Sequence, residues 1–424
     1  MVWKCGTFTF EQGPVLMGIL NVTPDSFSDG GQHNLFDDAC AFAKELAAAG
    51  AQIIDVGGES TRPGSDEVAV EEELSRVLPV VETLAKQGFC VSIDTRHAAV
   101  AQACLKAGAH IINDVSGFRD AAMVDVAASS DCGCVVMHMQ GEPKSMQQAP
   151  TYTDVVGQVG EYLVSQAKRL EEAGVAPERI CLDPGPGFGK TPEQSSALIE
   201  ATPHLSALGY SLMVAVSRKS YIGAYTGLSK PQMRDETSAL CTAAAFHDGA
   251  FVGRVHNVEA AVDAFKNSRR AFVALGSNMQ DPHQQLDDAV NAMRISIPHT
   301  WVVRVSSYVH SEPAYKEDQA VFVNAMAQVQ TLLEPEELLC HLNRIEDEQG
   351  RVRHEANGPR TLDLDITDFE GVVSTDPHLT LPHPRALERD FVVTPLLEIA
   401  PGCVLADGSV VNRDMVAYGK VITN

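Results

Sequence analysis

The amino-acid sequence predicts a (β/α)8 TIM barrel of the α/β class, followed by a smaller α+β domain. Three observations lead to this prediction. The chain has 424 residues, which is more than one ordinary hydrophobic core organises. Apolar strand-like runs alternate with amphipathic helical stretches as far as His256, and this rhythm changes at Ala271. Apolar residues make up 45% of the chain, which is enough to fill two cores.

Eight apolar runs predict the strands of the barrel. They are Val15–Val22, Gln52–Gly57, Phe89–Asp94, Ile111–Val115, Cys134–Met139, Arg179–Asp183, Leu212–Ser217 and Phe251–His256. Because these runs are continuously apolar, they predict strands buried on both faces, and such strands are parallel and joined by helices. Examples of the intervening helical stretches are Asp37–Ala49, Val70–Lys86, Asp154–Ala173 and Arg234–His247. Eight such units fit a barrel.

Polar residues gather where the predicted strands end. In chain order they are Asn21, Asp55, Asp94, Asn113, His138, Asp183, Ser217-Arg218-Lys219, and Arg254 with His256. Any one of them could be a helix cap or a loop-closing residue. Eight in succession at the same end of the strands are not explained in that way. They predict an active site at the carboxyl ends of the strands, where barrel enzymes carry it.

The list contains three carboxylates that we expect to be buried, which are Asp55, Asp94 and Asp183. Each needs a partner, since an unpaired buried charge is costly. Metal ligation is one answer. The neighbouring Asn113 and Lys219 favour another, in which one of Asp55, Asp94 and Asp183 accepts two N–H bonds from the amidine-like edge of an aromatic heterocycle. Asn21 becomes a neighbour of Arg254 and His256 once the barrel closes. That set suits a diphosphate with Mg²⁺.

Two loops qualify this interpretation. Gly57–Gly64 combines small residues, which let a ligand approach the backbone, with Arg62 as a planar cation for a phosphate. Asp183–Thr191 resembles a nucleotide phosphate loop but has three residues, not four, between Gly185 and Gly189-Lys190. We therefore expect a rigid turn that presents Asp183.

Charge and composition exclude several classes of function. A formal net charge of −24 argues against general nucleic-acid binding, while local arginine clusters can still hold anionic substrates. No apolar run approaches the ~20 residues that cross a bilayer, and Met1–Gly13 lacks the features of a signal peptide. The ten scattered cysteines indicate reduced thiols. We expect a cytoplasmic protein without nucleic-acid or membrane partners.

The second region has another rhythm. Its predicted elements are a strand Ala271–Leu275, a helix Pro282–Arg294, strands Trp301–Val309 and Ala320–Thr331, a helix from Leu333 to Gly350 and a strand Thr361–Asp368. This order predicts a sheet covered by helices. Lys266–Arg270 reads as a short polar linker. We therefore predict two domains, residues 1–267 and 268–424.

The most informative motif of this region contains Asp363 and Asp365. They are two apart on a predicted strand, so their side chains point to the same face and repel each other unless a cation lies between them. An exposed strand face is the alternative reading. A magnesium-dependent phosphoryl-transfer site is favoured because Arg351, Arg353 and Arg360 lie close by in the sequence.

The first region resembles the dihydropteroate synthase family. The stretches that carry the resemblance are Met17–Gly31, Gly57–Gly64, Ile111–Asp114, Met137–Gly141, Asp183–Lys190, Ser217–Ser220 and Arg254–His256. This family condenses a dihydropterin methyl diphosphate with p-aminobenzoate and releases diphosphate. The resemblance implies pterin contacts from Asp94, Asn113, Asp183 and Lys219, a Mg²⁺ ligand in Asn21, diphosphate contacts from Arg62, Arg254 and His256, and an aminobenzoate site formed by Thr61, Phe188, Lys219 and Ser220. A homodimer through the barrel is a further expectation.

The second region resembles the hydroxymethyl-dihydropterin pyrophosphokinases, which make that diphosphate from ATP. The matching stretches are Ala274–Asn278, Phe322–Ala325, Arg344–Glu346, Gln349–Arg353, Gly358–Ile366 and Leu381–Pro384. The resemblance implies a ferredoxin-like α+β fold with Mg²⁺ at Asp363 and Asp365. It further implies ATP phosphate contacts from Arg351, Arg353, Arg360, His383 and Arg389, and pterin contacts from Phe322, Asn324 and Phe391.

One alternative is a pterin-binding barrel of the methyltransferase type with a non-catalytic second half. Such a barrel needs no cations for a diphosphate, so Arg62, Arg254 and His256 count against it. The paired Asp363 and Asp365 count against a second half that only binds pterin.

Overall fold

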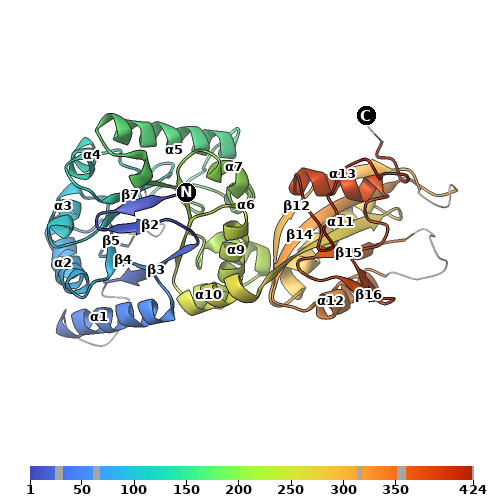
Figure 1. Cartoon of the computed structure of the whole chain (residues 1–424), viewed down its shortest axis with the longest axis horizontal. Helices are drawn as coiled ribbons and strands as arrows, with labels where there is room; N and C mark the ends of the chain where they lie inside the picture. The colour runs from blue at the N-terminus through green and yellow to red at the C-terminus, as the bar shows by residue number, and fades with distance from the viewer. Residues whose placement is uncertain (24–31, 61–66, 143, 314–317, 351–359, 423–424) are drawn as a thin grey trace. The chain divides into compact units, whose positions relative to one another are not determined.

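The structure is a computed structural model that describes residues 1–23, 32–60, 67–142, 144–313, 318–350 and 360–422. Two compact units make up the chain (Figure 1). One comprises residues 1–224 and 228–265, and the other comprises residues 225–227 and 266–424.

The first unit is a closed barrel of eight parallel strands, which confirms the predicted fold class. Its strands are β3 (Val15–Asn21), β4 (Ile53–Gly57), β5 (Cys90–Asp94), β6 (Ile111–Asp114), β7 (Gly133–Met137), β8 (Ile180–Asp183), β9 (Ser211–Val214) and β10 (Val252–Val255). Neighbouring strands pair in chain order, and β10 returns to β3. Almost every strand residue is buried, because helices cover the outside and side chains fill the inside.

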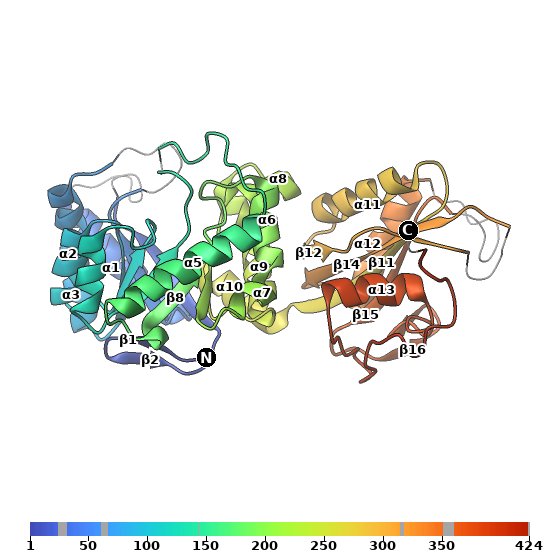
Figure 2. The same cartoon turned by 90° about the horizontal axis from the view of Figure 1, so that it is seen from above.

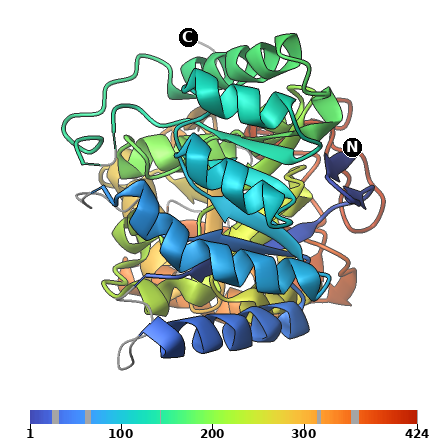
Figure 3. The same cartoon turned by 90° about the vertical axis from the view of Figure 1, so that its left-hand side faces the viewer.

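Helices follow the strands around the outside of the barrel. They are α1 (Gln32–Ala49), α2 (Val70–Lys86), α3 (Ala98–Lys106), α4 (Ala121–Ala128), α5 (Val155–Glu172), α6 (Pro192–Glu200), α7 (Thr202–Ser206), α8 (Ser220–Thr226), α9 (Asp235–His247) and α10 (Val258–Asn267). Short 3₁₀ turns lie at Pro177–Arg179 and Pro231–Arg234. Figures 1 and 3 show α1 to α4 side by side along one flank of the barrel.

An N-terminal hairpin, which the sequence patterns did not predict, closes one end of the barrel. Its strands are β1 (Trp3–Cys5) and β2 (Phe8–Phe10), and three-residue strands are too short to show a period. The Trp3 indole Nε1 donates to the Arg179 carbonyl at 3.0 Å, and the ring is fully buried among residues from the starts of the strands. Figure 2 shows the hairpin at the end of the barrel opposite the loop that follows β7.

The second unit has the βαββαβ order of a ferredoxin-like fold, as predicted. Its main elements are β11 (Arg269–Ser277), α11 (Pro282–Ser296), β12 (Thr300–Val305), β13 (Val309–Ser311), β14 (Phe322–Thr331), α12 (Pro335–Glu348) and β15 (Asp363–Phe369). The antiparallel sheet has the order β12-β14-β11-β15, and β13 also pairs with β14. A hairpin of β16 (Ser374–Asp376) and β17 (Leu379–Leu381) and a helix α13 (Asp390–Ile399) complete the unit.

Two details of the prediction were wrong. The run Trp301–Val309 is not one strand, because its pairing with β14 shifts between Val302 and Arg304 and the chain then leaves the sheet until β13. The polar run Lys266–Arg270 is not a linker of irregular structure. Helix α10 extends to Asn267 and β11 begins at Arg269, so Ser268 alone of these five residues lies outside regular structure, and it is buried.

The two faces of the antiparallel sheet are covered by different helices. Leu364 and Ile366 pack with α11 and α12 in one apolar cluster. Phe272 and Met326 pack with α13 in another. Side chains alternate along a strand, so Asp363 and Asp365 lie on the face that α13 partly covers. The fold thus places the predicted carboxylate pair on the side of the sheet away from α11 and α12.

Within the described residues, no helix is both long enough and apolar enough to cross a membrane. All ten cysteines are free thiols, and nine of them are buried.

Candidate active sites of the two units

The ends of four neighbouring barrel strands place their polar residues in one row. The strand register aligns Asn21 with Gly57, Gly57 with Asp94, and Asp94 with Asn113. Gly57 leaves space between its neighbours, because a Cβ there would lie 3.7 Å from both Asn21 Oδ1 and Asp94 Oδ2. The parallel register therefore brings together residues that are up to 92 positions apart in the sequence.

Arg254 lies at the centre of the barrel mouth and joins two of the predicted carboxylates. Its Nε donates to Asp55 Oδ2 at 2.6 Å, and its Nη2 donates to Asp94 Oδ2 at 2.6 Å. Asn113 Nδ2 donates to the same Asp55 oxygen at 3.1 Å. The sequence placed Asp55 at the strand ends but gave it no role. The structure identifies it as the partner that orients Arg254 and Asn113.

This charged group is only partly satisfied. Asp55 Oδ1 and Asp94 Oδ1 are buried, and neither has a hydrogen-bond partner among the residues that the structure describes. Burial raises the pKa of Asp94 to about 7, although Arg254 opposes the shift. Buried acceptors without donors are rare in folded proteins. They indicate a mouth that is built to accept N–H groups from a ligand.

Asp183 and Lys219 form the opposite side of the mouth. Asp183 Oδ1 accepts from the Gly185 N–H at 2.8 Å, and Gly185 has a φ of +62° with His138 O too close for any side chain. A tight turn therefore presents Asp183 at this end of β8, as the sequence predicts. Burial raises the pKa of Asp183 and lowers that of Lys219 to about 8. Lys219 Nζ donates to Pro186 O at 2.6 Å and lies 4.6 Å from the centre of the Phe188 ring.

Two polar contacts hold the loop after β9. Ser217 Oγ lies 2.9 Å from His256 Nδ1 and accepts from the His256 N–H at 3.0 Å. Arg218, which has a φ of +61°, makes a two-pronged ion pair with Asp235 at 2.6 and 2.8 Å. The loop leads into α8, whose first residue is Ser220. Because Ser217 holds His256 and lies two residues before Lys219, the loop after β9 links the positions of His256 and Lys219.

A pocket of about 300 Å³ opens beside Ser220. Its lining residues are Gln147, Pro150, Gly187, Lys190, Thr191, Pro192, Ser195, Ser220 and Tyr221. Lys190 is a functional candidate that the sequence reasoning missed, although it belongs to the Gly-Lys pair of the rejected phosphate loop. Its Nζ lies 3.0 Å from His138 Nδ1 and donates to three backbone carbonyls, and burial lowers its pKa to about 7.

The second unit carries a comparable row on the sheet face with α13. Asn324 pairs with Gly276, and Gly276 pairs with Asp363. Gly276 keeps the middle of this row open, because a Cβ there would lie 3.1 Å from Asn324 Oδ1. Asp365 follows on the same face, two residues further along β15, where it pairs with Ala274. Both aspartates are half-buried, so this face stays accessible to a ligand.

Arginines and aromatic rings surround this row. Arg360 makes an ion pair with Asp363 and lies 5.8 Å from the centre of the Phe322 ring. The Arg389 guanidinium lies 5.7 Å from the centre of the Phe391 ring. His383 Nδ1 accepts from the Arg385 N–H at 3.2 Å, and burial followed by Arg389 and Arg385 lowers its pKa to about 4. A neutral His383 therefore carries its proton on Nε2.

Four predicted site residues lie outside the described residues. They are Thr61, Arg62, Arg351 and Arg353. Their assignments remain predictions.

Comparisons with known proteins assign a family to each of the two units. The family model "Pterin binding enzyme" matches residues 17–256, and the model "7,8-dihydro-6-hydroxymethylpterin-pyrophosphokinase (HPPK)" matches residues 272–401. The dihydropteroate synthase of Escherichia coli K12 is 46% identical over 262 residues, which is 62% of this chain and 93% of that protein.

Two solved structures share the barrel. The Yersinia pestis dihydropteroate synthase with a sulfonamide drug complex is 41% identical with a TM-score of 0.59, and the match covers 63% of this chain and 97% of that one. The Xanthomonas albilineans dihydropteroate synthase with 4-aminobenzoic acid is 43% identical with a TM-score of 0.58, covering 61% and 93%.

The chain belongs to the pterin-binding enzymes. Its barrel is a dihydropteroate synthase, and a hydroxymethyl-dihydropterin pyrophosphokinase domain, which uses ATP, follows it in the same chain. The protein is thus a bifunctional transferase of folate biosynthesis that catalyses two successive reactions.

Proposed function

We propose that the mouth of the barrel binds the pterin through the two buried carboxylate oxygens that lack donors. Asp94 Oδ1 and Asp55 Oδ1 are the observation that supports this assignment. A pterin presents an amino group and ring N–H groups along one edge, which is the donor pattern that a carboxylate accepts in two-pronged fashion. Asp183, Asn113 and Lys219 then supply the remaining polar contacts around the ring.

We assign the diphosphate to the side of the mouth formed by β10 and β3. The hydrogen bonds of Arg254 within the described residues use Nε and Nη2, which leaves Nη1 for a phosphate oxygen. His256 is held by Ser217, and Asn21 lies on the strand that pairs with β10. A Mg²⁺ ion held by the Asn21 amide oxygen would neutralise charge on the leaving diphosphate.

The barrel reaction then needs positioning and charge, and no protein nucleophile. The C–O bond from the pterin methylene to diphosphate breaks, and the amine of p-aminobenzoate forms the new C–N bond and loses a proton. Arg254, His256 and Arg62 stabilise the leaving group. We assign the amine to the pocket beside Ser220, and we assign Phe188, Thr61 and Lys219 as further aminobenzoate contacts. The 4-aminobenzoic acid and sulfonamide complexes of the two solved relatives support a site of this kind.

In the second unit, we propose that the row on β14, β11 and β15 is the pyrophosphoryl-transfer site. Asp363 and Asp365 share one half-buried face, an arrangement that suits Mg²⁺, whose usual ligands are carboxylates and phosphates. When held by these two carboxylates, the ion would offset the negative charge of the ATP phosphates. Arg360, Arg389, His383, Arg351 and Arg353 are assigned to the phosphates, whereas Phe322, Asn324 and Phe391 are assigned to the pterin.

His383 can serve this role as a neutral donor. Its Nδ1 is occupied as an acceptor, so Nε2–H is the group that it offers to a phosphate oxygen. Arg389 and Arg385 lower the pKa of His383 further than burial alone does, which keeps the ring neutral at pH 7. The positive charge near the phosphates then comes from the arginines.

Product analysis tests both assignments together. The full chain with ATP, hydroxymethyl-dihydropterin and p-aminobenzoate should give dihydropteroate, AMP and diphosphate. Without p-aminobenzoate, the pterin diphosphate should accumulate. Without ATP, added pterin diphosphate should still be converted. A chain that binds pterin and makes neither product would instead support the methyltransferase-type alternative with a non-catalytic second half.

A further inference from the structure

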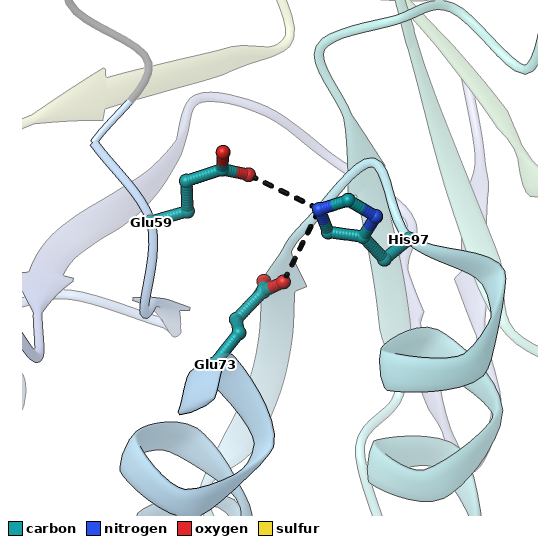
Figure 4. Close-up of side chains that lie close together, drawn as sticks. All are labelled: Glu59, Glu73 and His97. Atoms are coloured by element: carbon teal, nitrogen blue, oxygen red, sulfur yellow. Dashed lines mark ion pairs between the residues drawn. The ribbon is translucent and has the colours of Figure 1, made fainter. Parts of the chain in front are cut away.

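Three side chains that are not assigned to either reaction converge at the carboxyl end of β4 and β5. Glu59 follows β4, Glu73 lies in the first turn of α2, and His97 immediately precedes α3 (Figure 4). His97 Nε2 lies 3.4 Å from Glu59 Oε2 and 3.8 Å from Glu73 Oε2. One ligand atom from each of the three lies within 4.8 Å of the others. Figure 4 shows both carboxylates directed at the same ring nitrogen.

The backbone is built to bring these groups together. A Cβ at position 58 would lie 2.6 Å from Val77 Cγ1 and 3.1 Å from Glu73 Cγ, so Gly58 allows the chain after β4 to cross directly over α2. His97 is the residue before α3, yet its side chain makes no capping hydrogen bond. The His97 ring is therefore available to face Glu59 and Glu73.

The group is also unsatisfied. Glu73 is completely buried, and neither of its carboxylate oxygens has a partner of good hydrogen-bond geometry among the described residues, although the Thr95 side chain is close enough to lower its pKa. His97 Nε2 is likewise buried without such a partner. Removing one carboxylate from water without donors costs several kcal/mol, so a fold that retains it needs a compensating group.

The spacing of the donor atoms identifies that group. An N–H···O hydrogen bond spans about 2.7–3.2 Å, so 3.4 and 3.8 Å are too long. A tetrahedral zinc ion with Zn–N and Zn–O distances of about 2.0–2.2 Å places its ligand atoms ~3.4 Å apart. The observed separations match the edges of such a site.

We propose that Glu59, Glu73 and His97 form a binding site for one divalent transition-metal ion, with zinc as the best fit, separate from the substrate and magnesium sites. Two carboxylates and one imidazole are three ligands, so a fourth position remains for water or for Glu67, whose Oε1 lies 4.0 Å from His97 Nε2. A mixed nitrogen and oxygen donor set favours zinc or manganese over magnesium.

The surrounding charges are compatible with a dication. Arg96 donates to both oxygens of Glu59 at 3.1 and 3.3 Å, and it also lies within 4.0 Å of Glu67 and Glu142. One arginine thus faces three carboxylates, and the buried Glu73 adds a fourth carboxylate that Arg96 also influences. Arg96 acts as the outer partner that orients Glu59 as a ligand.

A metal at this position would have a structural role. It would tie the chain after β4 to α2 and α3, at a position two residues before Thr61 in the sequence. It would also place a positive charge near Asp94, whose pKa is sensitive to Glu73. The site is therefore expected to stabilise the barrel and to organise its mouth without contacting substrate.

Metal binding to the tag-free, full-length protein tests the proposal. After chelation and dialysis, Zn²⁺ is titrated against a competing chelator into the original protein and into Glu73→Gln, His97→Ala and Glu72→Gln. Glu72 is the matched control, because it neighbours Glu73 on α2 but its side chain is 58% exposed and pairs with Arg76. Glu73→Gln and His97→Ala should each lose one tightly bound equivalent of Zn²⁺, or bind it at least ~100-fold more weakly. Removing a residue that only orients a ligand lowers metal affinity by about 10–100-fold, and removing the ligand itself should lower it further. Glu72→Gln should retain it.

Two further measurements distinguish metal binding at this site from binding to cysteine thiolates and from loss of folding in a variant. Co²⁺ bound in the same position should give visible ligand-field bands without the near-ultraviolet thiolate absorption that cysteine ligands produce. Zn²⁺ should raise the melting temperature of the original protein and of Glu72→Gln, and leave that of His97→Ala unchanged. His97 is partly exposed, so this variant keeps the test valid even if Glu73→Gln fails to fold. Equal zinc stoichiometry in all four proteins overturns the proposal, as does a zinc-dependent melting shift that survives in His97→Ala.

Discussion

The barrel mouth and the pyrophosphokinase sheet both combine aspartates with arginines, but they differ in how deeply these aspartates are buried. In the barrel, Arg254 is bound between Asp55 and Asp94, both of which are buried. On the sheet, Asp363 and Asp365 are half-buried, and Arg360 pairs with one of them. The barrel site pairs two buried carboxylates with one arginine and leaves an oxygen of each without a donor among the described residues, whereas the sheet site keeps its carboxylates accessible.

This difference corresponds to the ligands of the two reactions. A pterin ring is neutral and offers N–H donors, so carboxylates that are already oriented by an arginine can receive it in a dry pocket. ATP is highly charged and brings a metal ion, so its site needs ligands that water and ions can reach. Under the proposed assignments, the same residue types would serve pterin recognition in one unit and neutralisation of phosphate charge in the other.

The largest effect is expected on the accessible carboxylates. Asp363→Asn or Asp365→Asn should abolish pyrophosphoryl transfer from ATP, a loss of several kcal/mol, or roughly 10³-fold or more in rate. Conversion of supplied pterin diphosphate by the barrel should be unchanged. Steady-state assays of the two half-reactions measure this. Near-normal kinase turnover in either variant would show that the carboxylate pair is not the metal site.

The next effect concerns stability in the barrel. Arg254→Leu leaves Asp55 and Asp94 without their cation and should reduce the free energy of unfolding by about 3–5 kcal/mol. Arg218→Leu is the matched control, because its ion pair with Asp235 is nearer the surface, and it should cost about 1 kcal/mol or less. Denaturant unfolding compares them. Adding Asp55→Asn and Asp94→Asn to Arg254→Leu should recover part of the loss, and an equal cost for both arginines would contradict the comparison.

Lys219 and Ser220 test the division of the mouth between the two substrates. Lys219→Ala should weaken binding of the pterin diphosphate by about 1.5–3 kcal/mol, as expected for a lost charged hydrogen bond. Ser220→Ala should mainly raise the KM for p-aminobenzoate.

Inhibition provides the companion measurement. Sulfonamides should compete with p-aminobenzoate and be insensitive to ATP. Competition with ATP, or unchanged kinetics for both substrates in Lys219→Ala, would place the aminobenzoate site elsewhere.

Asp94 predicts the pH dependence of pterin binding. Its pKa in the ligand-free protein is raised to about 7, so the carboxyl group is protonated below that pH and loses acceptor capacity. Affinity for the pterin diphosphate should therefore fall by up to about tenfold for each pH unit below 7, and level off above ~8. Calorimetric binding across this range measures the slope. Asp94→Asn should bind weakly with a flattened slope, and a slope that persists in this variant would assign the titration to another group.

The smallest effect is expected from separating the two domains. Fragments 1–267 and 268–424 should fold independently and keep their own half-reactions within about twofold, because each has its own core and the cut falls between α10 and β11. Circular dichroism and the two assays measure this. Aggregation of both fragments would indicate that the proposed boundary divides a shared core.

The sequence predicted the strands well because burial dictated their composition. All eight barrel strands appear within a few residues of their predicted positions, since both faces of a parallel strand must be apolar. Short or irregular elements were harder. The β1–β2 hairpin has too few residues for a period, and the division of 301–309 into β12 and β13 depends on how β14 pairs with them.

By itself, the sequence determined which polar residues stand at the ends of the strands and that Asp363 and Asp365 share one face, because strand periodicity is a local property. Tertiary structure decided the partners. Closure of the barrel brings Arg254 to Asp55 and Asp94, 199 and 160 positions away, and it is the packing of α2 and α3 that brings Glu73 to His97. Such contacts are set by strand register and helix packing over long sequence distances, and no local pattern records which buried charge meets which.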